Sequence, residues 1–150
     1  MSDPELAKEI RQRKRVEQDL QIEKDNFKRI FDKATDGHLI YQKKQFVACN
    51  NAALKLLGLK DKKELLHQDI VCWSPEFQPD GQRSVDKRND LIKQCFNQGM
   101  QRFDWVLKNK EGHTFWVDVV YTSIPYLGKP AIYISWRDKT EQKALEESLT

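Results

Sequence analysis

The chain of 150 residues contains 39% hydrophobic and 33% charged residues, which suffices for one core of ordinary size plus solvated helical extensions. Its net charge is only +3, and both signs are mixed along the chain, which argues against a dedicated nucleic-acid surface. No apolar run approaches the length of a membrane span, and the N-terminus lacks the features of a signal peptide.

An amphipathic helix is predicted for residues 1–31, with Ser2 or Asp3 as its cap. Positions 6, 13, 20 and 27 keep a seven-residue step and fall on one stripe of the helix, which indicates a partner-facing, coiled-coil-like surface. Arg13 interrupts the apolar character of this stripe. Acidic residues flank the basic cluster at residues 11–15, so a solvated face is favoured over phosphate contact. The apolar members of the stripe are Leu6, Ile10, Val16, Leu20, Phe27, Ile30 and Phe31.

Short elements follow the helix. Strands are predicted at His38–Tyr41 and Phe46–Cys49, joined as a hairpin. Asn50 then provides a cap for a short helix at Ala52–Leu57, and Gly58 closes that helix.

The next segment is rich in helix and turn signals. Asp61 and Glu64 have the spacing of a capping box, and residues 73–77 have the pattern of a single helical turn. Residues 78–81 read Gln-Pro-Asp-Gly, a β-turn in which proline presets one φ and glycine accepts a positive one. Ser84 is predicted to cap a longer helix that runs to Asn97.

Three strands are predicted in the last part of the chain, at Phe103–Lys108, Thr114–Ile124 and Ala131–Arg137. The order of two strands, helices and three strands implies an α+β fold. Its five-stranded antiparallel sheet has the short helices on one face and is flanked by N- and C-terminal helices.

Four landmarks in this order resemble a PAS sensory domain over about residues 27–142. One of them, at residues 138–141, is similar to the Asp-x-Thr exit motif that starts the signalling helix of many bacterial PAS proteins. The resemblance implies a linker helix at residues 1–31, a sensory domain at 32–138 and the start of a signalling helix at 139–150. The landmarks are Asp36-Gly37, Asn50-Asn51-Ala52-Ala53 with Leu57-Gly58, Lys110-Glu111-Gly112, and Asp138-Lys139-Thr140-Glu141.

Strand alternation divides the side chains of the predicted sheet between two faces. The resemblance implies that the inner face lines a ligand cavity together with the helices. Candidate cavity residues are Leu39, Tyr41, Arg88, Phe96, Trp105, Leu107, Val117, Val119, Tyr121, Ile134 and Trp136. The outer face, with Val106, Trp116, Val120, Ile124 and Tyr133, is too apolar to stay in water.

We expect the leading helix to cover that outer face, in a parallel homodimer whose interface contains Leu20, Phe27, Ile30, Phe31, Trp116, Val120 and Tyr133. A monomer whose own helix folds back is the alternative. Aromatic walls suit a flat organic ligand, but the same bulky groups can simply fill the space, and filling is slightly favoured. Arg88 is the best single candidate for binding an anion, against an exposed arginine as the alternative.

The identity of a cofactor stays unknown. The place of the cysteine that a photoadduct-forming flavin PAS needs holds Asp69, and the place of the histidine of a haem PAS holds Arg88, so both cofactors are disfavoured. The histidines and cysteines have no metal-ligand spacing, and no metal site is predicted. The three cysteines, odd in number and without a CxxC pair, are Cys49, Cys72 and Cys95. This pattern predicts a reduced, cytoplasmic setting. The cytosolic part of a membrane-associated sensor would also provide such a setting.

No catalytic motif of a hydrolase, kinase or cyclase is present, so an enzyme is disfavoured. The favoured function is a dimeric sensor that relays a ligand or conformational state to an effector outside this chain, of the histidine kinase or diguanylate cyclase type. The alternative is a ligand-free relay with a filled core. The signal is expected to leave through Asp138 and Thr140, with Thr140 capping the exit helix.

Overall fold

A computed structural model describes residues 3–149, which divide into two compact units on either side of the step from Lys33 to Ala34. The first unit contains helix α1, Pro4–Lys33, and the second contains a sheet with its helices. Within the described residues, no helix has the combination of length and apolar character that a bilayer crossing requires.

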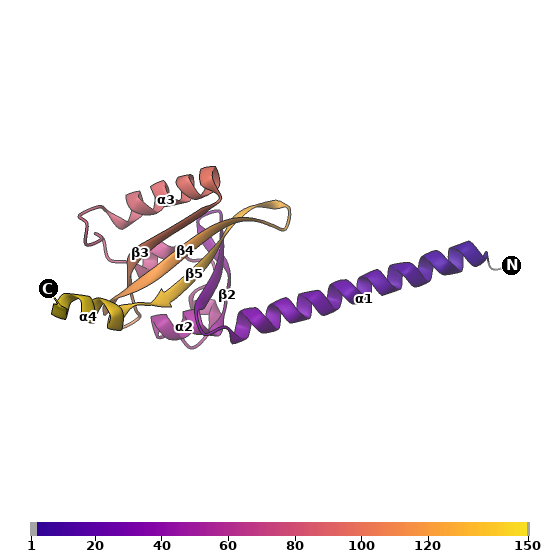
Figure 1. The fold of residues 1–150 in the computed structure, drawn as a ribbon, viewed down its shortest axis with the longest axis horizontal. Helices are drawn as coiled ribbons and strands as arrows, with labels where there is room; N and C mark the ends of the chain where they lie inside the picture. Colours follow the sequence, from indigo (N-terminus) through magenta and orange to yellow (C-terminus); the bar gives the residue numbers. More distant parts are fainter. Residues whose placement is uncertain (1–2, 150) are drawn as a thin grey trace. The chain divides into compact units, whose positions relative to one another are not determined.

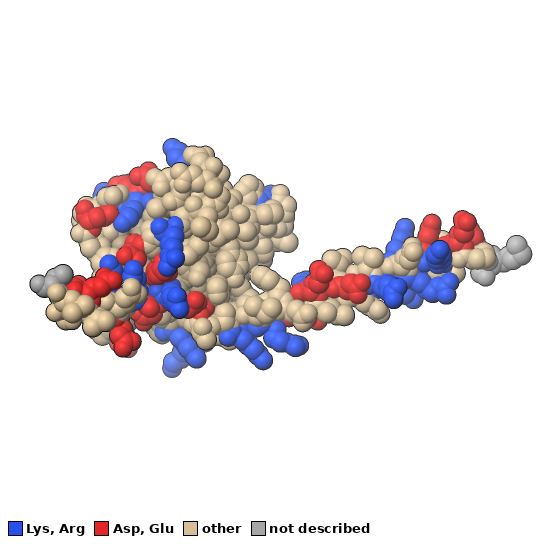
Figure 2. All heavy atoms as spheres, viewed as in Figure 1, with Lys and Arg blue, Asp and Glu red and all other residues tan. Residues whose placement is uncertain are grey.

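Helix α1 begins at Pro4, where the carboxylate of Asp3 accepts a hydrogen bond of 3.0 Å from the backbone N–H of Glu5. The alternative cap Ser2 lies outside the described residues. The predicted stripe is exposed from Leu6 to Ile30, and Phe31 is the one buried residue among those described in the helix. Blue and red side chains are interspersed along α1 in Figure 2, as expected for a solvated helix.

The second unit contains a five-stranded antiparallel sheet in the order β2-β1-β5-β4-β3 (Figure 1). Its strands confirm the predicted α+β architecture and are β1 (Gly37–Gln42), β2 (Gln45–Cys49), β3 (Met100–Lys108), β4 (Thr114–Tyr126) and β5 (Lys129–Asp138). Strand β5 lies in the centre of the sheet between β1 and β4 and leads directly to helix α4 (Thr140–Leu149). The strand that leads to α4 is therefore hydrogen-bonded on both of its edges.

The last hairpin is tighter than the sequence predicted. Pairing continues to Tyr126 opposite Lys129, which leaves only Leu127 and Gly128 as the loop, with φ of 52° and 77°. These positive angles are those of a two-residue hairpin turn, whose twist matches that of the strands. The strands predicted to end at Ile124 and to begin at Ala131 were therefore too short, because pairing continues through Pro125 opposite Pro130.

The Asn50 cap of helix α2 (Asn51–Leu57) is confirmed. Its side-chain oxygen accepts hydrogen bonds from the N–H groups of Ala53 at 3.0 Å and His38 at 2.9 Å, and its amide donates to the carbonyl of Asp36 at 3.0 Å. One buried amide thus fixes both the start of α2 and the start of β1. The helix ends as predicted at Gly58, which has φ of 73°.

The predicted capping box is also confirmed, at the 3-10 helix η1 (Lys62–Glu64). The predicted helical turn at residues 73–77 was wrong, because the 3-10 turn η2 lies earlier, at Ile70–Trp73. Ser74 has an extended backbone, and Phe77 pairs with Arg83 in an isolated bridge. Pro75 disfavours a helical conformation in the residue before it, which explains why η2 ends there.

Ser84 is not the cap of helix α3 (Ser84–Gln98), as the sequence had predicted, but its first residue. Its hydroxyl donates to the carbonyl of Pro75 at 2.5 Å and accepts a hydrogen bond of 2.9 Å from the side-chain amide of Gln78. Gln78 also bonds both backbone groups of Val106, at 2.9 and 3.1 Å. The hydroxyl therefore ties the preceding loop to strand β3 instead of capping the helix.

Candidate functional site

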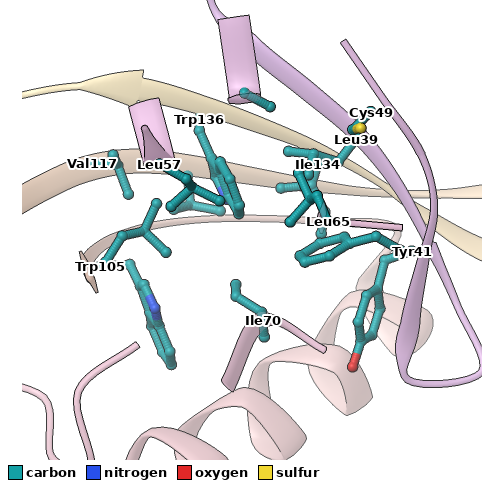
Figure 3. Close-up of a cluster of buried hydrophobic side chains, with 14 of the residues drawn as sticks. Leu39, Tyr41, Cys49, Leu57, Leu65, Ile70, Trp105, Val117, Ile134 and Trp136 are labelled. Atoms are coloured by element: carbon teal, nitrogen blue, oxygen red, sulfur yellow. The ribbon is translucent and has the colours of Figure 1, made fainter. Parts of the chain in front are cut away.

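The inner face of the sheet and the surrounding helices enclose one apolar cluster (Figure 3). In Figure 3 the labelled side chains of Tyr41, Trp105 and Trp136 project from the strands toward the side where Ile70 and the helices lie. Both tryptophans are completely buried. Predicted cavity residues in this cluster are Leu39, Tyr41, Trp105, Leu107, Val117, Val119, Tyr121, Ile134 and Trp136.

Aromatic rings meet edge to face across the cluster. Phe46 lies 5.5 Å from Tyr41 and 5.8 Å from Trp136 between ring centroids, and Phe103 lies 4.8 Å from Tyr121 and 6.0 Å from Trp105. These separations are those of packed aromatic pairs, so side chains occupy the space between strands and helices that the resemblance had assigned to a ligand cavity. Phe46 and Phe103 belong to this packing although neither was a candidate residue.

A buried polar cluster borders the aromatic rings. The hydroxyl of Tyr41 donates to Asp69 at 2.8 Å, and the guanidinium of Arg88 donates to that hydroxyl at 3.2 Å and forms an ion pair with Asp69. Burial and the hydrogen bond to Asp69 raise the pKa of Tyr41 well above its ordinary value, so the hydroxyl keeps its proton. Because Asp69 balances the charge of Arg88, the predicted anion-binding residue already has an internal counter-ion.

Asp69 is the site residue that the sequence reasoning missed. It appeared there only as a replacement for a cysteine, since it lies 19 residues from Arg88 and 28 from Tyr41 and shares no periodicity with either. The only sequence feature that marks Asp69 is its position directly before the apolar run Ile70–Trp73. That position does not indicate which basic residue Asp69 would pair with.

The two buried tryptophans differ in their hydrogen bonding. The indole N–H of Trp105 donates to the hydroxyl of Ser74 at 2.9 Å, and that hydroxyl donates to the carbonyl of Ile70 at 2.8 Å. The indole N–H of Trp136 is buried without a partner among residues 3–149. The indole ring of Trp136 is therefore held by packing alone, two residues before the end of β5.

Phe96 does not join the cluster. Its side chain on α3 is 45% exposed and lines an open pocket at the edge of the domain together with Tyr41. Of the predicted cavity residues, Phe96 and Arg88 thus lie outside the packed apolar interior, one at the surface and one in the polar cluster.

The outer face of the sheet is partly covered within the second unit. Val106 is buried there, whereas the predicted interface residues Trp116, Val120 and Tyr133 are half-buried. The ammonium of Lys143 on α4 lies 4.6 Å from the centroid of the Trp116 ring, a cation–π contact. Helix α4 therefore contacts the outer face at Trp116. The sequence analysis had expected only the leading helix to cover this face.

Two lysines fasten the exit helix to strand β3. The carboxylate of Asp104 forms ion pairs with the ammonium groups of Lys139, at 2.8 Å, and of Lys143, at 3.2 Å. Partial burial raises the pKa of Asp104, but the hydrogen bonds from Lys139 and Lys143 outweigh it and hold that pKa below its usual value. We call Asp104, Lys139 and Lys143 the exit clamp.

The predicted exit residues lie at the junction of β5 and α4. The carboxylate of Asp138 accepts a hydrogen bond of 2.9 Å from the backbone N–H of Thr140. Thr140 is the first residue of α4, so the predicted capping role belongs to Asp138 and not to Thr140. The backbone N–H of Lys139 also bonds the carbonyl of Trp116 at 3.0 Å, which joins the junction to strand β4.

The histidines lie apart, at the start of β1, after η1 and in the β3–β4 hairpin. Burial lowers the pKa of His38 in spite of the nearby charge of Asp36. Throughout residues 3–149, no three His, Cys, Asp or Glu side chains come together in a group that could hold a metal ion.

Comparison with known proteins assigns the second unit to a family. The family model for the PAS domain matches residues 35–141, which contain the whole sheet and the start of α4. The chain belongs to the PAS domain family. PAS domains are regulatory sensory modules and are generally non-catalytic, and no curated protein matches this chain.

Solved structures show the same fold. A PAS domain from Colwellia psychrerythraea has a TM-score of 0.65 and 19% identity, with 78% of this chain and 97% of that one covered. The PAS domain of an HTR-like protein from Haloarcula marismortui has a TM-score of 0.63 and 19% identity, covering 83% and 98%. A PAS domain from a two-component sensor histidine kinase has a TM-score of 0.65 and 14% identity, covering 79% and 98%.

Proposed function

We propose that this PAS domain relays a conformational state through a packed interior to an effector that follows α4. The burial of Trp105, Trp136 and Tyr121, each at most 1% exposed, carries this proposal. An interior filled by its own side chains leaves the arrangement of strands and flanking helices as the signal. The effector would be of the histidine kinase or diguanylate cyclase type, in the cytoplasm or in the cytosolic part of a membrane-associated sensor.

The route of the relay follows strand β5. Ile134 and Trp136 pack in the interior, and Asp138 at the end of the same strand fixes the first turn of α4. A shift of Trp136 would reach α4 through the three residues that separate it from Thr140. Because the indole N–H of Trp136 makes no hydrogen bond to the described residues, the ring can change position without breaking a side-chain hydrogen bond.

The relay is proposed to act as a parallel homodimer. The stripe on α1 exposes Leu20, Phe27 and Ile30, and the outer face keeps Val120 and Tyr133 half-buried. Apolar surface of this extent favours a second copy as its cover. Trp116 would complete the interface. Phe31, which the sequence analysis had also named, is already buried within the single chain and is not part of this proposal.

A sensor with a small organic ligand inside the domain is the second candidate. The buried N–H of Trp136 favours it, because a ligand acceptor would satisfy that group. Such a ligand would have to displace rings that now contact one another.

Native mass spectrometry of the purified chain distinguishes the candidates. The relay predicts twice the chain mass with no additional mass. A dimer that carries a defined additional mass would favour the sensor, and a monomer at high protein concentration would refute the dimer.

A further inference from the structure

A pocket of about 430 Å³ opens where helix α3 faces the β1–β2 turn and strand β5. It lies beside the packed interior and not within it. Ile92 and Phe96 of α3 form one part of its wall, with Tyr41 of β1 and Ile132 of β5. Its volume and its apolar, aromatic lining are those of a site for a small molecule. We call it the rim pocket.

The charge at the rim pocket is entirely positive. Lys43, Lys44 and Lys93 line it, and its lining includes no acidic residue. Lys129 lies next to Lys43, and the proximity of this second ammonium lowers the pKa of the Lys43 ammonium. Within residues 3–149 none of these lysines forms an ion pair with a carboxylate. An anion in the pocket would relieve this concentration of like charge.

The turn that presents two of these lysines has an unfavourable sequence. Lys43 and Lys44 form a two-residue hairpin loop with φ of 54° and 61°. Asn-Gly is the usual sequence for such a loop, because both residues adopt positive φ and a lysine Cβ is strained there. Two strained lysines beside a pocket point to a function of their charges, since the turn alone would form more readily without them.

We propose that the rim pocket binds a small aromatic carboxylate, with its ring against Phe96 and Ile92 and its carboxylate among Lys43, Lys44 and Lys93. The rings of Phe96 and Tyr41 suit stacking with a flat ligand. Lysine ammonium groups are mobile point charges that can reach a carboxylate held at the pocket mouth. This inference stands apart from the proposed relay, because the pocket exists whether or not the interior transmits a signal.

Isothermal titration calorimetry of the whole chain with indole-3-acetate tests the ligand class. Indole-3-acetamide is the matched control, since it keeps the ring and replaces the carboxylate by a neutral amide. Decanoate keeps the carboxylate and removes the ring. We expect indole-3-acetate to bind at least about fivefold more tightly than either control. Equal binding of the acid and the amide, tighter binding of decanoate, or no binding of indole-3-acetate at millimolar concentration would overturn the proposal.

A turn variant tests the lysines directly. In the double variant Lys43→Asn, Lys44→Gly, the melting temperature should stay the same or rise, while the affinity for indole-3-acetate falls about fivefold to tenfold. The double variant Lys24→Gln, Lys28→Gln removes the same charge from α1 and should bind as the wild type does. Unchanged affinity in the turn variant, or an equal loss in the α1 variant, would overturn the role of the rim lysines.

A wall variant tests the aromatic contact. Phe96→Ala removes a half-exposed ring and should leave the fold intact, while the affinity for indole-3-acetate falls several-fold. If this variant binds as tightly as the wild type, the ligand does not occupy the rim pocket.

Discussion

Asp69 and Asp104 each bind basic side chains, but the basic partner of Asp69 is buried and those of Asp104 are partly exposed. Asp69 pairs with Arg88, whose side chain is only 4% exposed, and accepts a hydrogen bond from the Tyr41 hydroxyl. Asp104 binds Lys139 and Lys143, whose side chains are 18% and 24% exposed. A buried pair is costly to break because one charge stays behind, whereas partly exposed pairs contribute little and are screened by salt. The first cluster therefore fixes the domain, and the second is an adjustable contact of the exit helix.

The largest effect is expected at the buried cluster. Arg88→Ala leaves Asp69 without its counter-ion and should lower the free energy of unfolding by about 3–5 kcal/mol, measured by urea denaturation at pH 7. The double variant Arg88→Met, Asp69→Leu removes both charges and should recover most of this loss. A loss of less than about 1 kcal/mol for Arg88→Ala would mean that the cluster does not fix the domain.

The two buried tryptophans should differ in stability when each is changed to Phe. Both variants lose similar volume, but Trp105→Phe also removes the hydrogen bond to Ser74, while Trp136→Phe removes an N–H without a partner in the described chain. Trp105→Phe should therefore be less stable than Trp136→Phe by about 1–2 kcal/mol in urea denaturation. Equal stability would indicate that the N–H of Trp136 finds a partner in solution.

The junction residues should differ as well. Asp138→Ala removes the acceptor for the first N–H of α4 and should lower its stability by about 1 kcal/mol, seen as faster hydrogen exchange at residues 140–143. Thr140→Ala should change little, because Thr140 contributes its backbone N–H to this bond. In a parent protein with its effector, Asp138→Ala should weaken output more than Thr140→Ala. Equal effects would contradict the assignment of the cap.

The smallest effect is expected at the exit clamp. Asp104→Asn should lower stability by less than about 1 kcal/mol, and the difference from the wild type should shrink in high salt. The pKa of Asp104 is depressed in the folded chain, so the clamp is fully present above the ordinary carboxylate pKa of about 4 and is lost as the pH falls through the lowered value. The difference in α4 hydrogen-exchange rates between wild type and Asp104→Asn should therefore shrink as the pH is lowered from 6 to 3. A difference that stays constant with pH would mean that the variant acts on α4 by a route other than the charge of Asp104.

Sequence alone predicted the sheet, its two faces and most of the caps, because these depend on local patterns. Asn50 and Gly58 each act on neighbouring residues, and alternation along β3 and β5 assigned Trp105 and Trp136 to one face correctly. The partners of Arg88 and Asp104 were not predictable, since each joins segments far apart in the chain.

The sequence favoured a filled interior only slightly over a ligand cavity. Residue types and faces give the volume of the side chains but not the space between sheet and helices. Phe46 illustrates this, because its ring packs between Tyr41 and Trp136 although it was not among the candidate residues.

Hydrogen exchange of residues 139–149 in Trp136→Phe, with Trp105→Phe as the matched control, tests the relay most directly. Both variants make the same chemical change in the same buried cluster, but only Trp136 lies on the strand that leads to α4. The relay predicts faster exchange in α4 for Trp136→Phe and wild-type exchange there for Trp105→Phe, even though Trp105→Phe is the less stable variant. Unchanged exchange in Trp136→Phe, or equal acceleration in both, would contradict transmission through β5.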